Sequence, residues 1–182
     1  WAVSRPIRAL SNAIQRAIVL PLFRHYIPIT ANGLENLAGI EPPVIFAANH
    51  TSHLDTPAIF AALPVRWRQR VAPAARQEQF RAYFEPQRFS RKEVLWAAIQ
   101  YCLAGLFFNV YPLPREMAGV RRALRTTGEL VSRGYCPLVF PEGERTPDGR
   151  MLAFQPGVGL MAVRLKVPVV PIFIDGLYQV YS

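Results

Sequence analysis

The sequence predicts a single α/β domain, in which a mixed, mostly parallel β-sheet is flanked by helices on both faces. Short apolar and β-branched runs alternate with longer stretches of helical periodicity, a pattern typical of this fold class. The chain has 182 residues, enough for one well-packed domain, and hydrophobic residues make up 51% of it, enough for a sizeable core. In addition, reactive polar residues follow the ends of several predicted strands.

The first expected element is an amphipathic helix within residues 1–30. Apolar residues recur there at spacings of three and four, and no acidic residue precedes Leu34. The apolar stripe and its accompanying arginines are Ile7, Leu10, Ile14, Ile18 and Leu22 with Arg5, Arg8, Arg16 and Arg24. Such a helix is suited to a membrane interface, or else packs on the domain with its arginines in water. We expect residues 1–30 to be a membrane-associating segment and residues 31–182 to form the catalytic domain.

Strands and helices alternate along the rest of the chain. Strands are expected at residues 44–48, 71–75, 108–113, 137–140 and 167–174. Helices are expected at residues 57–63, 92–106, 117–133 and 156–166. The stretch 92–106 is strongly apolar, but it is too short and too interrupted by Gln100 for a membrane span. Because the chain starts at Trp1 without an initiator methionine and stops after a strand-like run, we expect a fragment at both ends.

The chain is basic, with a formal net charge of +9, and only Lys92 and Lys166 among its 21 basic residues are lysines. Arginine binds phosphate bidentately, so this composition suits nucleic acid, anionic lipid or a phosphorylated substrate. An arginine-rich coding composition is an alternative cause. The sequence contains no recognised nucleic-acid signature, so nucleic acid is not an expected partner. Cys102 and Cys136 lie in apolar surroundings and are expected to be reduced core residues.

The first polar motif follows the strand expected at residues 44–48. It places His50 five residues before Asp55. Histidine is suited to proton transfer near neutral pH, and a carboxylate on its other ring nitrogen would fix its tautomer. Alternatively, Asp55 is a helix N-cap and His50 an ordinary loop residue. A metal site of His50, His53 and Asp55 is disfavoured, because the sequence offers no further histidine or cysteine cluster.

The second polar motif follows the strand expected at residues 137–140. Gly143 would bring backbone N–H groups close to an anion, and Arg145 could clamp a phosphate. Glu142 could orient that arginine or accept a hydrogen bond from a substrate hydroxyl. A turn with solvated charges is the alternative. If the strands are parallel, both motifs and Arg115, which follows another strand, converge on one edge of the sheet.

Together the motifs resemble those of the lysophosphatidic acid (1-acylglycerol-3-phosphate) acyltransferase family of glycerolipid acyltransferases. Four blocks match in order: Asn49-His50 with Ser52 and Asp55, Arg115 in the middle arginine block, residues 140–145, and residues 167–171. Glu144 and Thr146 stand where the family usually has Thr and Ser. The family's Lys-Glu-Leu stretch is not evident around residues 76–80, and these departures leave the acceptor in question.

The resemblance implies a glycerolipid acyltransferase-like fold and an O-acyltransferase activity without cofactor or metal. Acyl-CoA or acyl-acyl carrier protein would be the co-substrate, and the acceptor a lysophospholipid, in the first place 1-acylglycerol-3-phosphate, giving phosphatidic acid. His50 would be the base held by Asp55. The implied substrate-binding residues are Asn49, Ser52, Arg115, Glu142, Gly143 and Arg145. Ser52 is also expected to form hydrogen bonds within its own loop.

The resemblance further implies peripheral membrane association at the cytoplasmic face. Three alternatives remain open at this point: a different lysolipid or non-phosphate acceptor, hydrolysis of the same thioesters, and a non-enzymatic module that binds lipid at a membrane surface. The last of these would have no use for His50 and Asp55 at their observed spacing.

Overall fold

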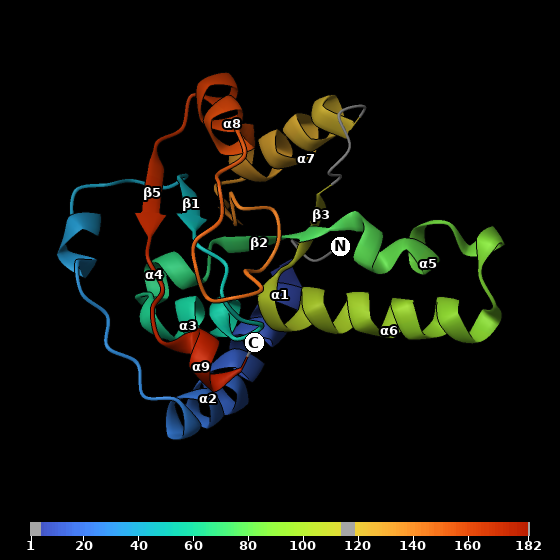
Figure 1. Cartoon of the computed structure of the whole chain (residues 1–182), viewed down its shortest axis with the longest axis horizontal. Helices are drawn as coiled ribbons and strands as arrows, with labels where there is room; N and C mark the ends of the chain where they lie inside the picture. Colours follow the sequence, from blue (N-terminus) through green and yellow to red (C-terminus); the bar gives the residue numbers. More distant parts are fainter. Residues whose placement is uncertain (1–4, 114–118, 182) are drawn as a thin grey trace.

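A five-stranded parallel sheet forms the centre of the computed structural model, which describes residues 5–113 and 119–181 (Figure 1). The strand order is β3-β2-β4-β1-β5, and every neighbouring pair is parallel. The strands are β1 (Ile45–Ala48), β2 (Val71–Arg76), β3 (Tyr111–Leu113), β4 (Cys136–Val139) and β5 (Val169–Ile172). The predicted α/β class with a mostly parallel sheet is therefore confirmed.

Helices cover both faces of the sheet because successive residues of a strand point to opposite sides. Phe46 of β1 enters a core shared with α2 (Leu20–Tyr26), α3 (Asp55–Ala62) and α4 (Val65–Arg68). Its neighbour Ile45 enters a second core shared with α7 (Val120–Ser132) and α8 (Gly157–Leu165). Burial on both faces explains the short, continuously apolar runs by which these strands were predicted.

An arm projects from the sheet (Figure 1). It is made of the 3₁₀ turns η3 (Gln77–Phe80) and η4 (Pro86–Arg88), with helices α5 (Arg81–Phe84) and α6 (Arg91–Phe108). Helix α6 begins with a capping box, in which the side chains and backbone N–H groups of Ser90 and Glu93 bond reciprocally. Aromatic rings of the η3–α5 segment pack on Tyr101 of α6. The two remaining short elements are η2 (Leu34–Leu37) and α9 (Leu177–Val180).

The N-terminal helix packs on the domain with Arg16 and Arg24 exposed, which was one of its two expected arrangements. Helix α1 (Arg5–Ile14) continues through a π-helical turn (Gln15–Val19) into α2, and it packs against α6 and α3. The buried residues of this helix are Ser11, Gln15 and Leu20. Of the apolar stripe, Leu10, Ile18 and Leu22 are exposed and Ile14 is half-buried. The segment therefore packs on the domain and still presents an apolar face to solvent.

Several element limits shift by a few residues from their predicted positions. Phe108 closes α6 instead of starting β3, because Asn109 takes the left-handed conformation (φ 55°) that ends the helix. The start expected for α7 at Met117 lies outside the described residues. Cys136 is buried as predicted, whereas Cys102 was wrongly placed in the core and is exposed on α6. None of the described helices has the length and apolar content to cross a membrane.

Candidate active site

The two polar motifs meet because their strands are neighbours. Strands β1 and β4 pair in register, with Phe46 opposite Leu138 and Ala47 opposite Val139. Both loops therefore leave the same edge of the sheet side by side. The chain passes from β1 to one side of the sheet and from β4 to the other, so this pair is the topological switch point, where open α/β sheets place their ligand crevice.

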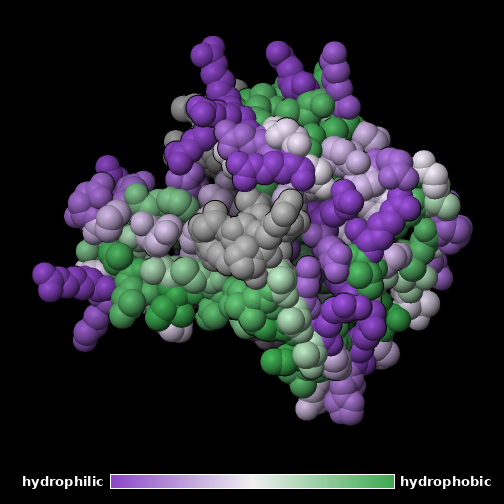
Figure 2. Space-filling view, turned by 180° about the vertical axis from the view of Figure 1, so that it is seen from behind, coloured by the Kyte–Doolittle hydropathy of each residue, from purple (hydrophilic) through white to green (hydrophobic). Residues whose placement is uncertain are grey.

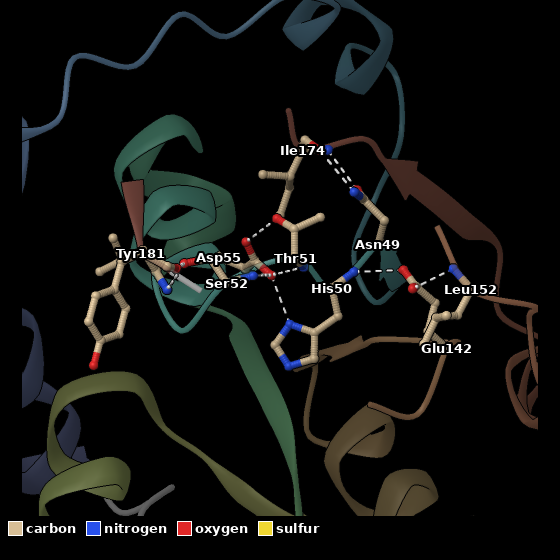
Figure 3. A network of polar contacts seen from close by, with 10 residues as sticks. Asn49, His50, Thr51, Ser52, Asp55, Glu142, Leu152, Ile174 and Tyr181 are labelled. Carbon is tan, nitrogen blue, oxygen red and sulfur yellow. Dashed lines mark hydrogen bonds and ion pairs between the residues drawn. The ribbon is translucent and has the colours of Figure 1, made fainter. Parts of the chain in front are cut away.

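His50 and Asp55 form a hydrogen-bonded pair in the loop between β1 and α3. His50 Nδ1 lies 2.8 Å from Asp55 Oδ2, and Asp55 is fully buried at the first turn of α3. The same Oδ2 accepts the backbone N–H groups of Thr51 (2.7 Å) and Ser52 (2.9 Å), and the Thr51 hydroxyl donates to Oδ1 (3.1 Å). These bonds hold the carboxylate in one orientation, toward the imidazole (Figure 3).

This geometry determines the tautomer of His50. A carboxylate that already receives backbone N–H donors is an acceptor, so His50 Nδ1 carries the proton and donates it to Asp55. Nε2 then has the lone pair of a base, and in Figure 3 it points away from Asp55. The His50 side chain keeps 23% of its surface exposed, so an incoming hydroxyl can reach it. The pair has the arrangement of a general base and its orienting acid.

The loop after β4 makes three contacts with His50, one to its ring and two to its backbone. The Phe140 ring stacks on the imidazole at a centroid distance of 4.0 Å and an interplanar angle of 19°. Glu142 Oε1 accepts the backbone N–H of His50 (2.8 Å), and the backbone N–H of Thr146 donates to the carbonyl oxygen of His50 (3.0 Å). The motif after β4 therefore fixes the backbone and ring of the residue that carries the base.

Glu142 has a different position from the one expected. Its carboxylate is buried, and its second oxygen, Oε2, accepts the backbone N–H of Leu152 at 2.8 Å. With both oxygens engaged by backbone donors, Glu142 braces two loops (Figure 3). Its assignment to the substrate-binding residues stays a prediction.

We expect Glu142→Gln to lower both stability and turnover. The amide NH₂ would face one of the two backbone N–H donors, leaving that buried group without an acceptor at a cost of about 1–3 kcal/mol in the free energy of unfolding. Because the lost bond positions His50, kcat should fall more than either KM changes. Denaturant unfolding and steady-state kinetics check both effects, with the exposed neighbour change Glu144→Gln as the matched control. Equal losses in the two variants would contradict the bracing role.

Gly143 also departs from its expected role. Its φ of +77° suits glycine, and its N–H donates to the carbonyl oxygen of Phe140 at 3.0 Å. That donor closes the turn, and the expected role of Gly143 in binding an anion stays a prediction. The Gly143 carbonyl oxygen accepts from Arg76 Nε (3.1 Å), and a terminal nitrogen of Arg76 lies 3.7 Å from a Glu144 carboxylate oxygen.

Arg145 is exposed at the end of the second motif. Burial, followed by the electrostatic effects of Arg145 and His50, lowers the pKa of the His53 imidazole, and Asp55 opposes this effect. Arg145 therefore lies close enough to the loop of the His50–Asp55 pair to act on it electrostatically. An exposed guanidinium in this position can bind a phosphate bidentately.

The amide of Asn49 and the hydroxyl of Ser52 are both engaged within the protein. Asn49 exchanges two hydrogen bonds with the backbone of Ile174, at 2.7 and 2.8 Å, and so joins the ends of β1 and β5. Ser52 accepts from the N–H of Leu54, as expected for a bond within the loop, and donates to the carbonyl oxygen of Tyr181. Both side chains are buried, and Asn49 also borders a cavity of about 510 Å³ lined by Thr51, Asp148 and Tyr178. Their assignment to the substrate-binding residues stays a prediction.

Sequence reasoning missed two residues of this edge. Phe140 was noted only as part of a motif, and its stacking on His50 needs the β1–β4 pairing to be known. Arg76 ends β2, which lies next to β4, so the rule that placed the other groups at strand ends also applied to it. Arg115 lies outside the described residues. Within the described ranges, no cluster of His, Cys, Asp and Glu has metal-site geometry.

Comparisons with known proteins agree with this geometry. Residues 28–175 match the family model described as Acyltransferase. A chloroplastic 1-acyl-sn-glycerol-3-phosphate acyltransferase of Brassica napus is 30% identical over 79% of this chain and 36% of its own length. The alpha enzyme of that name from Mus musculus is 29% identical over 77% of this chain and 43% of its own. The chain thus spans less than half the length of these relatives.

A solved structure shares the fold. It is the 1-acyl-sn-glycerophosphate (LPA) acyltransferase PlsC of Thermotoga maritima, which aligns with a TM-score of 0.56 and 25% sequence identity. The alignment covers 96% of this chain and 58% of that one.

Proposed function

Because this chain belongs to the acyltransferase family, we propose that it transfers a fatty acyl group from a thioester to the free hydroxyl of a lysophospholipid. The proposed acceptor is 1-acylglycerol-3-phosphate, as the names of the relatives suggest, and the product is phosphatidic acid. The proposed donor is acyl-CoA or acyl-acyl carrier protein. The observation that carries the proposal is the His50–Asp55 pair at the switch point of the sheet, with Nε2 of His50 as the open base.

The proposed reaction is one displacement at the thioester carbonyl. His50 Nε2 takes the proton of the acceptor hydroxyl while that oxygen bonds to the carbonyl carbon, and Asp55 stabilises the imidazolium that forms. The tetrahedral intermediate then loses the thiolate as the C–S bond breaks, and His50 returns the proton to the sulfur. The step needs no acyl-enzyme intermediate, so neither cysteine has a part in it. General base catalysis contributes roughly 10²- to 10⁴-fold in such steps.

Arg145 is proposed to hold the acceptor phosphate and so to place the hydroxyl near His50. Arg145 is exposed, and after burial it is the next cause that lowers the pKa of His53. Arg115 is proposed as a second phosphate ligand from its match to the middle arginine block. Arg76 adds positive charge at the same edge, next to Gly143.

We expect Arg145→Ala to raise the acceptor KM by about ten- to a hundredfold, since a charge-assisted hydrogen bond contributes roughly 1.5–3 kcal/mol. The donor KM should change little. Arg150→Ala, at an exposed arginine five residues further along the loop, is the matched control. If only the donor KM rises, Arg145 binds phosphates of the donor, and its assignment to the acceptor is wrong.

The segment 1–30 is proposed to bind the membrane peripherally at the cytoplasmic face, where a lysophospholipid acceptor resides. Its exposed stripe of Leu10, Ile18 and Leu22, with Arg16 and Arg24 on the same helix, supports this proposal. Each arginine near an anionic leaflet contributes roughly 1 kcal/mol, which salt screens, whereas apolar insertion is not screened. Vesicle sedimentation should therefore fall at high salt without vanishing. Complete release by salt would exclude apolar insertion.

Incubation with labelled acyl-CoA, or labelled acyl-acyl carrier protein, and a panel of lysolipids tests the function. Labelled phosphatidic acid from 1-acylglycerol-3-phosphate is the expected product. Labelled product from another lysolipid alone would replace the proposed acceptor. Labelled free fatty acid without a lipid product would identify a thioester hydrolase, in which water takes the place of the hydroxyl.

A further inference from the structure

Helix α6 has apolar side chains on more than one face, and the described structure buries only one of these faces. From residue 94 to residue 108 it has no charged side chain. Its buried side consists of Ala97, Tyr101 and Gly105, which are spaced four apart and therefore lie on one face. The η3–α5 segment packs on that face through the aromatic rings around Tyr101. A helix that is apolar all round is normally buried on all sides, and this one is not.

The uncovered side of α6 presents a second apolar row. Leu95, Ile99 and Leu103 are also spaced four apart, and all three are exposed, together with Trp96. Leu95 and Trp96 keep 62% and 63% of their surface. Figure 2 shows hydrophobic residues along the length of the arm and hydrophilic side chains at its far end. We call Leu95, Trp96, Ile99 and Leu103 the α6 face.

The charges around the α6 face favour an anionic surface. The tip of the arm carries Arg88, Arg91 and Lys92 as exposed cations, against two acidic residues, Glu85, which pairs with Arg88 at 3.1 Å, and Glu93. At its other end α6 contacts α1, and the amide of Gln15, which begins the π-helical turn after α1, donates to the carbonyl oxygen of Phe107. The α6 face thus lies between a basic tip and a basic N-terminal helix.

We propose that the α6 face inserts into the interface of an anionic bilayer leaflet and holds the whole arm flat on the membrane. This inference rests on the proposed function, because it identifies the surface by which a lipid-modifying domain meets its substrate. An interfacial helix combines an apolar face with basic residues, and a tryptophan suits the boundary of acyl chains and headgroups. A second copy of this chain fits the face less well: its net charge of +9 repels another copy, whereas it attracts an anionic leaflet.

A native cysteine on α6 provides a labelling site with which this proposal can be tested. Cys102 is exposed on α6 and Cys136 is fully buried, so an environment-sensitive fluorophore labels Cys102 selectively. On vesicles of phosphatidylcholine and phosphatidylglycerol, the emission should shift to the blue and should be quenched by brominated lipids, but not by iodide in the water. Unchanged emission on protein that sediments with the vesicles would overturn the proposal.

A double substitution, Leu95→Glu with Ile99→Glu, tests the energetic contribution of the same face. We expect vesicle partitioning to fall about tenfold or more, because two inserted apolar side chains become charged. Val163→Glu on α8 is the control, since that side chain is 75% exposed on a different helix, and its partitioning should stay near the wild-type value. Equal losses in both variants would show a general charge effect and would contradict the proposal.

Acyl transfer to a short-chain, water-soluble acceptor separates this inference from the proposed function. The double variant should transfer to that acceptor at the wild-type rate, which also shows that it is folded. If the label at Cys102 of the wild-type protein inserts into vesicles but the protein transfers no acyl group, the membrane proposal for the α6 face is supported and the proposed function is wrong. If light scattering shows a dimer that the double variant abolishes, while vesicle binding is unchanged, the face is an interface between copies and the proposal is wrong.

Discussion

Replacing His50 with alanine is expected to lower kcat for acyl transfer by roughly 10²- to 10⁴-fold, the contribution of a positioned general base. The other two histidines cannot take its place. His25 is on the N-terminal helix, and His53 has no carboxylate bonded to a ring nitrogen in the described structure. Neither ring is held as the His50 ring is, between Asp55 and Phe140. Steady-state transfer of labelled acyl groups measures the effect.

The fold should tolerate this change, because the backbone of His50 keeps its bonds to Glu142 and Thr146 when the ring is removed. Circular dichroism and thermal unfolding verify this. His53→Ala is the control for removing an imidazole from the same loop, and we expect it to reduce kcat far less. Undiminished turnover in a folded His50→Ala protein would disprove the mechanism.

Much of the fold was predictable because buried parallel strands leave a simple signature. Residues 44–48 and 137–140 were recognised as apolar runs ended by polar motifs, and they became β1 and β4 with limits shifted by one residue. The convergence of their loops followed from the rule that parallel strands share a carboxyl edge. The pairing of β1 with β4 did not follow, because strand order depends on long-range contacts that no local pattern encodes.

The N-terminal helix shows what periodicity leaves open. Its apolar stripe was compatible with a membrane-binding helix or with a helix packed on the domain, and in the structure the helix packs on the domain while Leu10, Ile18 and Leu22 stay exposed. It does so through a polar pair, Ser11 and Gln15, whose side chains bond to each other while Gln15 also bonds to Phe107, 92 residues away. A buried glutamine that finds its acceptor on another helix has no local sequence signal.

The roles within the site were harder to predict than their location. Glu142 was predicted to orient Arg145 or to accept from a substrate hydroxyl, and Asn49 was predicted to bind substrate from its match to the family's first block. Both turned out to satisfy backbone groups of neighbouring loops. The backbone N–H and C=O groups at the ends of parallel strands need partners, and buried side chains supply them at a crowded edge. Arg145 is exposed and has no such bond to the backbone among the described contacts, and its role as a phosphate ligand stays a prediction.

Replacing Asp55 with asparagine is expected to reduce kcat by roughly 10²- to 10⁴-fold, nearly as much as the loss of His50. The amide oxygen should occupy the Oδ2 position, because three donors converge there: Thr51 N–H, Ser52 N–H and His50 Nδ1–H. The amide NH₂ then faces the Thr51 hydroxyl, which can turn and accept. Geometry is thus retained while the negative charge is lost.

The loss of that charge is what separates this prediction from a folding defect. Without the carboxylate, the imidazolium formed in the transition state has no countercharge, so kcat falls while both KM values remain near those of the wild type. Weaker bonds to a neutral acceptor should also lower the free energy of unfolding by about 1–3 kcal/mol. The kinetics should therefore be measured well below the melting temperature of the variant. Asp175→Asn, an exposed carboxylate at the same sheet edge, is the matched control and should change neither quantity. A folded Asp55→Asn protein with wild-type kcat would show that Asp55 only caps α3 and that His50 works without a charged partner.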